Sequence, residues 1–466
     1  MRRRSFLYTI GAGSLLLLGV SCKKLIEIPP NPPTAITEAQ QFSDSATTMA
    51  AVAGVYTYGA YGMGFTFNDG QLSWSTGVSG DELVYAGSSS NAEVKQFYDN
   101  GLTPINGVLS TSWTSPYTGI YPVNVIMERV ENSPALSATL KRRVKSEMKV
   151  VRALYYFNLV NLFGPVPIVT SSDYRANTLL GRGSVDSVYG LVFSDLEDAM
   201  QGLAVDYPSD GHARPNLYTA EFLLAKARLY RGEWQKALDA ANDIIESHVY
   251  TLETDLNNVF LRGSTEAIWQ IPAVGPYSTT AEAAQFIPYA PGVVPSYILS
   301  PSLLNAFEPD DQRLVNWANK ITVNTGGVDR DVYHPYKYKN YYPGSTTEDF
   351  MVFRLADLYL IRAEAAAHLD NTSQAIDDID EVRTRAGLAG TAAVTKDEVL
   401  AAVAKERFTE LFTEWGNRWF DLKRTGTIDA VLGAEKPNWK PFCALYPVPR
   451  SQIILDPNLK QNPGYN

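Results

Sequence analysis

Residues 221–247 read EFLLAKARLYRGEWQKALDAANDIIES, and this stretch decides the fold class. Apolar residues recur three and four positions apart on both sides of Gly232, which predicts two helices joined by a short turn. Small side chains at Ala225 and Ala237 allow two antiparallel helices to approach closely, and Trp234 opens the second helix. The stretch therefore predicts a tightly packed helix pair.

The same unit recurs at residues 359–387, YLIRAEAAAHLDNTSQAIDDIDEVRTRAG, where Ala363 and Ala375 repeat the spacing of the first pair. Matched helix pairs of this kind are typical of tetratricopeptide-like repeats. Residues 140–164 and 187–203 carry helical periodicity as well, and the first of them stops at Gly164. We therefore predict a mostly α fold with minor β structure, built on a tetratricopeptide-like helical scaffold.

The charge balance argues against one class of partner. The chain has 40 Lys and Arg against 50 Asp and Glu, a formal net charge of −10. No Lys- or Arg-rich stripe appears that could follow a phosphate backbone. Nucleic acid is therefore excluded as the expected partner, and neutral or cationic ligands fit better.

The first 35 residues have the features of an exported, anchored protein. Arginines at 2–4 precede an apolar stretch at 6–20 that is too short to span a membrane of ~20 residues. Cys22 follows directly, and four prolines lie within 29–33. An ordinary secretory signal is one interpretation, but the junction resembles a bacterial lipobox, so we expect Cys22 to be the lipidated first residue. Cys443 would then lack a disulfide partner.

The chain offers little catalytic chemistry. The four histidines lie in no metal-binding spacing and are interpreted as surface or capping residues: His212, His248, His334 and His368. A glycoside hydrolase needs two carboxylates across a cleft, and the candidates are Asp81, Glu82, Glu308, Asp310 and Asp311. The acidic run at 376–381 lies in an expected helix and is interpreted as a solvated face. We expect no enzyme, cofactor or metal site.

Residues 405–426, KERFTELFTEWGNRWFDLKRTG, form the densest mixture of charged and aromatic residues. An Arg-clamped site for an acidic ligand is one interpretation. The even mixture of signs favours the other, a helix hairpin whose aromatic face is core and whose charges pair across the turn at Gly416.

This stretch resembles the C-terminal signature of the SusD/RagB family of surface lipoproteins. RALYYFNLVNLFGPVPIV at 152–169, the helix LADLYLIRAEAAA and the terminal LYPVPRSQIILDPNLKQNPGY agree in order. The resemblance implies tetratricopeptide-like units with irregular loop excursions. It also implies a protein, anchored in the outer membrane and facing outward, that caps a TonB-dependent SusC-like channel and delivers oligosaccharide or, in some members, peptide. Such proteins bind and do not catalyse.

The resemblance places ligand-stacking aromatics after the early acidic pair, here GDELVYAGSSSNAE, where Tyr85 is the best match. Sugar rings stack on Tyr and Trp through their C–H faces, and amides bridge hydroxyls. The candidate ligand residues are Tyr85, Asn91, Tyr289, Tyr297, Trp317 and Tyr336. Two alternatives are a surface glycoside hydrolase and a scaffold whose repeats bind only a partner protein.

The expected organisation is one SusD-like domain behind a processed leader. We expect a signal peptide at 1–21, a proline-rich tether at 22–35 and the domain at 36–466. Within the domain the expected helical repeats are 36–58, 114–265 and 350–426, the ligand loops are 59–113 and 266–349, and an extended C-terminal strap is 430–466.

Overall fold

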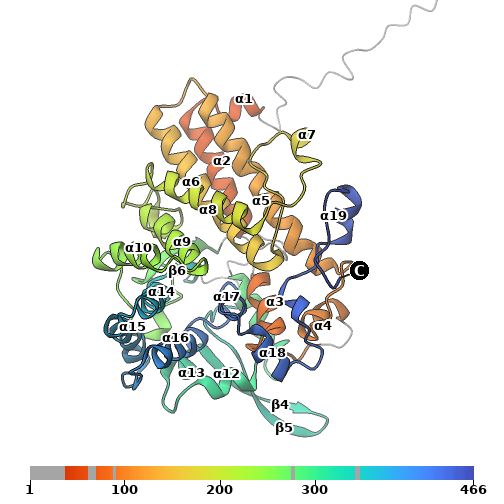
Figure 1. The fold of residues 1–466 in the computed structure, drawn as a ribbon, viewed down its shortest axis with the longest axis vertical. Coiled ribbons are helices and arrows are strands. Elements are labelled where there is room, and N and C mark those ends of the chain that lie inside the picture. The colour runs from red at the N-terminus through yellow and green to blue at the C-terminus, as the bar shows by residue number, and fades with distance from the viewer. Residues whose placement is uncertain (1–36, 61–69, 88–90, 274–278, 342–346, 466) are drawn as a thin grey trace, which may run out of the picture.

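The computed structural model describes residues 37–60, 70–87, 91–273, 279–341 and 347–465. Helices dominate it, and the expected mostly α fold class is confirmed (Figure 1). The expected signal peptide, Cys22 and the expected tether lie outside the described residues. No helix in the described part of the chain is long and apolar enough to cross a membrane.

The α-helices are α1 Glu38–Gln41, α2 Ser45–Ala60, α3 Leu72–Ser79, α4 Ala92–Tyr98, α5 Gly107–Asn132, α6 Ala138–Phe163, α7 Tyr174–Asn177, α8 Val185–Met200, α9 Leu217–Tyr230, α10 Trp234–Glu246, α11 Ala281–Phe286, α12 Pro301–Ala306, α13 Gln312–Trp317, α14 Leu355–His368, α15 Thr372–Arg385, α16 Lys396–Glu410, α17 Asn417–Arg424, α18 Ile428–Glu435 and α19 Arg450–Leu455. Short 3-10 helices are η3 Asp210–His212, η4 Leu256–Asn258 and η5 Pro441–Ala444. The strands are β1 Leu83–Tyr85, β2 Ala267–Pro272, β3 Tyr297–Leu299, β4 Ala318–Thr325, β5 Val328–Pro335 and β6 Asp349–Arg354.

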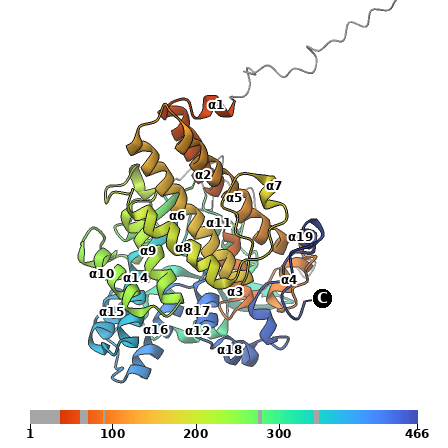
Figure 2. The same cartoon turned by 45° about the horizontal axis from the view of Figure 1, so that its top comes forward.

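Both predicted helix pairs are present, as α9–α10 and α14–α15. Gly232 takes φ +70° in the turn of the first pair, a conformation that costs glycine least. Ala225, Ala237, Ala363 and Ala375 are fully buried. Helix α10 packs on α14, so the two units stack, and Figures 1 and 2 show them following one another along one side of the molecule.

A second group of long helices, α5, α6 and α8, continues this scaffold (Figure 2). Helix α6 begins after the N-cap Ser137 and ends at Gly164, as its sequence predicts. Helix α5 begins at Gly107, earlier than the expected boundary at 114, because the Asn106 side chain accepts a hydrogen bond from the Leu109 amide and caps it. Because α5 begins at Gly107, the first loop region ends earlier than the predicted boundary at 113.

The two predicted loop regions contain regular structure of their own, which corrects the prediction that they lack helices. Helices α3 and α4 lie in the first region, and α11–α13 lie in the second. Three antiparallel two-stranded sheets are formed, by β1 with β3, by β2 with β6 and by β4 with β5. The β4–β5 hairpin projects from the lower end of the molecule in Figure 1.

The C-terminal segment lies along the body, but it is not uniformly extended, because it contains most of α18 as well as η5 and α19. Its irregular parts are held by hydrogen bonds to the end of α6. The Tyr446 amide donates to the Leu162 carbonyl at 2.9 Å, and Asn462 Nδ2 donates to the Phe163 carbonyl at 3.0 Å. These hydrogen bonds fix the C-terminal segment against the end of α6.

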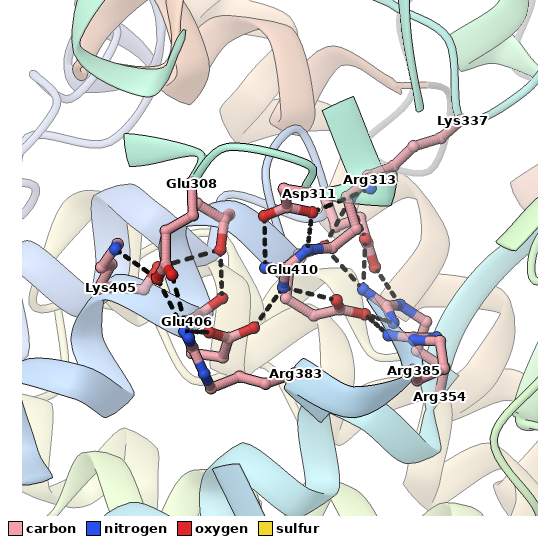
Figure 3. A network of polar contacts seen from close by, with 12 residues as sticks. Glu308, Asp311, Arg313, Lys337, Arg354, Arg383, Arg385, Lys405, Glu406 and Glu410 are labelled. Carbon is pink, nitrogen blue, oxygen red and sulfur yellow. Dashed lines mark hydrogen bonds and ion pairs between the residues drawn. The ribbon is translucent and has the colours of Figure 1, made fainter. Parts of the chain in front are cut away.

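The 405–426 stretch forms the predicted hairpin of α16 and α17, with Gly416 at φ +72° in the turn. Arg407 pairs with Asp421 across it, Nε to Oδ2 at 2.7 Å, as predicted. Glu406, Glu410 and Glu414 instead pair with distant segments, which corrects the prediction for these three residues. These bonds make a buried network with five cations and five carboxylates: Arg313, Lys337, Arg354, Arg383, Arg385, Glu266, Asp311, Glu406, Glu410 and Glu414 (Figure 3).

Glu410 is the centre of this network. Arg313 and Arg354 reach its carboxylate at 3.2 and 2.5 Å, and Arg385 binds it as well. Burial alone would raise the pKa of Glu410, but the three guanidinium groups hold it well below its ordinary value. The network therefore joins α13, β6 and α15 to the end of α16.

Candidate functional site

Tyr85 is the last residue of β1 and lies on a stack of aromatic side chains. It pairs with Tyr297 on β3, with ring centroids 5.9 Å apart. Tyr297 in turn stacks on Trp74 of α3 at 5.5 Å and meets the Phe286 ring edge to face at 5.9 Å. Trp74 and Tyr297 are buried, whereas Tyr85 is half-buried. The stack fixes the position of a surface tyrosine.

Two features keep the Tyr85 ring in place and neutral. A Cβ at Gly87 would lie 2.6 Å from the ring, so only glycine leaves room for this packing. Loss of solvent raises the pKa of the Tyr85 phenol above its ordinary value. At neutral pH the phenol is protonated, as an ordinary tyrosine is, and is able to donate a hydrogen bond.

The acidic pair before β1 anchors that strand. Arg418 of α17 binds Asp81 through Nη2 at 2.6 Å and Nε at 2.9 Å. Glu82 is 1 % exposed and accepts the Thr413 amide at 3.0 Å. Both side chains bind the 413–418 segment, so they hold the strand that carries Tyr85. Sequence reasoning missed this role, although the acidic pair and Arg418 both stood out.

Two of the three remaining candidates for hydrolytic chemistry are also engaged in ion pairs, whereas Asp310 is exposed. Glu308 binds Arg383 at 2.9 Å and Lys405 at 2.7 Å, and Asp311 binds Arg313 at 2.8 Å within the buried network (Figure 3). Asp378, from the acidic run interpreted as a solvated face, is buried against Arg362 at 2.6 Å, which corrects that interpretation for it. Its partner lies on the neighbouring helix α14.

The other predicted ligand residues are divided between surface and core. Tyr289, in the loop between α11 and β3, is 64 % exposed. Asn91 is exposed and caps α4, where its side chain accepts the Val94 amide at 3.2 Å. Tyr336 is half-buried just after β5, with Lys339 Nζ 5.6 Å from its ring centroid. Strand β3, which pairs with β1, also packs beside β5.

Two predicted ligand residues are core residues in this structure, and we correct the prediction for them. Tyr297 is 5 % exposed because its ring fills the space between Tyr85 and Trp74. Trp317 is fully buried and its Nε1 donates to the Leu256 carbonyl at 2.9 Å. Neither ring has a face to offer to a ligand, and Tyr297 instead supports Tyr85.

The described residues contain no group of three or more His, Cys, Asp or Glu side chains that could hold a metal ion together. His334 is buried, not at the surface as interpreted, because its ring packs edge to face on Tyr336 and bonds Asn319 Nδ2 at 3.1 Å. Cys443 is buried and forms no disulfide with another described residue.

The Glu82 carboxyl gives a pH-dependent prediction. Burial raises its pKa from 4.5 to about 8, so the folded protein keeps a proton that the unfolded chain loses above pH 4.5. Stability from this group is complete below pH 4.5 and falls as pH rises towards 8, by up to ~1.4 kcal/mol per pH unit. We expect Glu82→Gln to remove that slope in melting temperatures measured from pH 5 to 8. Equal slopes in both proteins would contradict the assignment, and Glu93→Gln on exposed α4 is the control.

The described geometry defines a class: a helical-repeat protein that presents tyrosines on irregular loops, backed by buried aromatic rings. Comparisons with known proteins agree with it. The model of the SusD family matches residues 302–465, and a model described as "Starch-binding associating with outer membrane" matches residues 60–229. The chain belongs to the SusD/RagB family.

Individual relatives match over nearly the full length. SusD-like protein P25 of Formosa agariphila is 25% identical over an alignment of 516 residues, which covers 96% of each chain. A SusD superfamily structure from Bacteroides vulgatus superposes with a TM-score of 0.80 at 18% identity, covering 91% of this chain and 99% of the other. A laminarin-binding SusD-like protein gives a TM-score of 0.76 at 24% identity, covering 91% and 100%.

Proposed function

We propose that this protein binds an oligosaccharide or polysaccharide at the cell surface and delivers it to a TonB-dependent SusC-like transporter of the outer membrane. The observation that carries the proposal is the half-buried Tyr85 ring, held by the stack of Tyr297 and Trp74. A fixed, neutral aromatic ring with a protonated hydroxyl suits the C–H face and hydroxyl edge of a sugar.

The wider setting follows from the leader and the family. A lipidated Cys22 would anchor the protein in the outer membrane, and the prolines of 22–35 would hold the body away from it as a spacer. The name of one matching family model, "Starch-binding associating with outer membrane", supports this location. We propose binding without catalysis, because Asp81, Glu308 and Asp311 are committed to ion pairs and Glu82 is buried.

The ligand residues that we propose are Tyr85, Asn91, Tyr289 and Tyr336. Calorimetry against a panel of laminarin, soluble starch, xylan, galactomannan and pectin tests the function. We expect at least one polysaccharide to bind to the wild-type protein. Failure of the whole panel, for a protein with a normal melting curve, would remove the proposal.

Tyr85→Ala should weaken binding of the polysaccharide selected by that panel about five- to tenfold, since a stacked ring contributes roughly 1 kcal/mol. The melting temperature should change little, because Tyr85 is only half-buried. Tyr121→Ala is the matched control, since Tyr121 is 56 % exposed on α5, away from the loops. Unchanged affinity in the Tyr85 variant would exclude Tyr85 from the site.

A further inference from the structure

A pocket lined with aromatic rings, separate from the Tyr85 stack, lies where the C-terminal strap meets the segment after α4. It measures about 510 Å³, and we call it the strap pocket. Its walls include Asn100, Asn438, Trp439, Lys440, Phe442 and Tyr465. Figures 1 and 2 place α4, α18 and the C-terminal end side by side, on elements other than those that carry Tyr289 and Tyr336.

The aromatic rings of the strap pocket are held in fixed positions. Phe442 meets Tyr465 edge to face at 4.9 Å, and Gly464, at φ +88°, lies so close that a Cβ there would be 2.3 Å from the Phe442 ring. Trp439 is half-buried, with Nε1 bonded to Asp429 at 2.9 Å and its ring against Trp419 at 5.9 Å. Preorganised rings of this kind bind a flat ligand face with little loss of side-chain entropy.

The polar groups of the strap pocket suit a hydroxylated ligand. Asn100 is 8 % exposed, and its Nδ2 donates to the Ser79 carbonyl at 2.9 Å. Its Oδ1 is buried and has no hydrogen-bond partner within the described parts of the chain. That oxygen is shielded from solvent, so the polar groups that a ligand in the pocket can reach are those at the rim. Asn438 and Lys440 add exposed donors at the rim.

One helix connects this pocket with the proposed primary site. Asn91 is the N-cap of α4, and Asn100 lies just beyond its C-terminal end. The 7 residues of α4 span ~10 Å at 1.5 Å per residue, so the two asparagines lie beyond opposite ends of this helix. A sugar chain of several units spans such a distance, whereas a short oligosaccharide fills only one of the two sites.

We propose that the strap pocket is a second saccharide subsite, which takes a distant unit of the same chain that contacts Tyr85. Trp439 supplies the stacking surface, and the exposed Asn438 and Lys440 side chains bind hydroxyls at the rim. This inference rests on the proposed function, because it requires that the protein bind glycan at all.

Binding measured at two chain lengths tests the subsite. Trp439→Ala should weaken binding of the polysaccharide selected from the panel about five- to tenfold, and leave its shortest binding oligosaccharide unaffected. Tyr85→Ala should weaken both. Asn438→Ala, at an exposed position, is a second variant that does not disturb the packing against Trp419, and it should give a smaller loss with the same length dependence. Tyr121→Ala is again the control.

The outcomes separate the two proposals. If no polysaccharide binds to the wild-type protein, the proposed function and the subsite both fail. If polysaccharide binds and both the Trp439 and Asn438 variants match the wild type, only the subsite is wrong. An equal loss for short and long ligands would show that Trp439 acts on the Tyr85 site through the fold, which also overturns the subsite.

Discussion

Replacing Arg354 by alanine should lower the free energy of unfolding by about 3–5 kcal/mol, the cost of breaking a buried ion pair from one side. Arg354 is 1 % exposed and bonds Glu266, Glu410 and Glu414 at 2.5–3.1 Å (its Glu414 partner through both Nε and Nη2). The variant leaves these carboxylates buried with fewer cations. Urea denaturation followed by circular dichroism measures the loss.

Two further variants are controls for the stability loss of Arg354→Ala. Arg354→Lys keeps the charge but loses the planar fork that reaches three carboxylates, so an intermediate loss is expected. Arg330→Ala removes an exposed arginine of β5 and should change stability by no more than ~0.5 kcal/mol. If Arg354→Ala were as stable as Arg330→Ala, the network would not hold β6 to α16.

The loss of unfolding free energy caused by Arg354→Ala should depend on pH in a direction that the pKa of Glu410 sets. The pKa of Glu410 lies below its ordinary value of 4.5 in the folded protein, so its ion pairs stabilise the fold above that pH. The stabilisation disappears as pH falls through the folded pKa. We therefore expect the stability difference between wild type and Arg354→Ala to be largest near neutral pH and to shrink in acid.

The parts of the fold that were predictable from sequence are those encoded locally. The Ala225–Ala237 and Ala363–Ala375 spacings and the glycine turn specify a helix pair within some 30 residues, and both pairs are present. The start of α5 was placed too late because the residues before 114 are rich in Gly, Ser and Thr, a composition typical of loops. Pro116 and Pro122 lie inside that helix, where packing outweighs propensity.

The site was less predictable, because burial and pairing depend on residues far apart in the sequence. In the sequence, Asp81 resembles a catalytic carboxylate. Its ion-pair partner Arg418 lies 337 positions away, so no local pattern shows that Asp81 is already paired. Tyr297 and Trp317 lie in proline-rich, aromatic segments that read as binding loops. Their burial depends on Trp74 and Leu256 respectively, which no local pattern reveals.

Tyr297→Ala should reduce both stability and binding, which makes it the most informative change at the site. Truncation of a buried aromatic ring costs about 3–5 kcal/mol. The ring lies between Tyr85 and Trp74, so its loss also removes the support of the Tyr85 ring. At a temperature where the variant remains folded, we expect polysaccharide affinity to fall at least as far as in Tyr85→Ala.

Tyr297→Phe separates support from contact. The phenylalanine ring keeps the stack on Trp74 and the packing behind Tyr85, and it removes only the hydroxyl. If Tyr297 acts as a core support, this variant should bind polysaccharide like the wild type and melt within a few degrees of it. If Tyr297 contacts sugar through its hydroxyl, Tyr297→Phe should weaken binding while Tyr85→Ala and Tyr297→Phe together weaken it further. Calorimetry on Tyr297→Ala, Tyr297→Phe, Tyr85→Ala and the double variant decides between these roles. Only the support role predicts that loss of the Tyr297 ring weakens binding and loss of its hydroxyl does not.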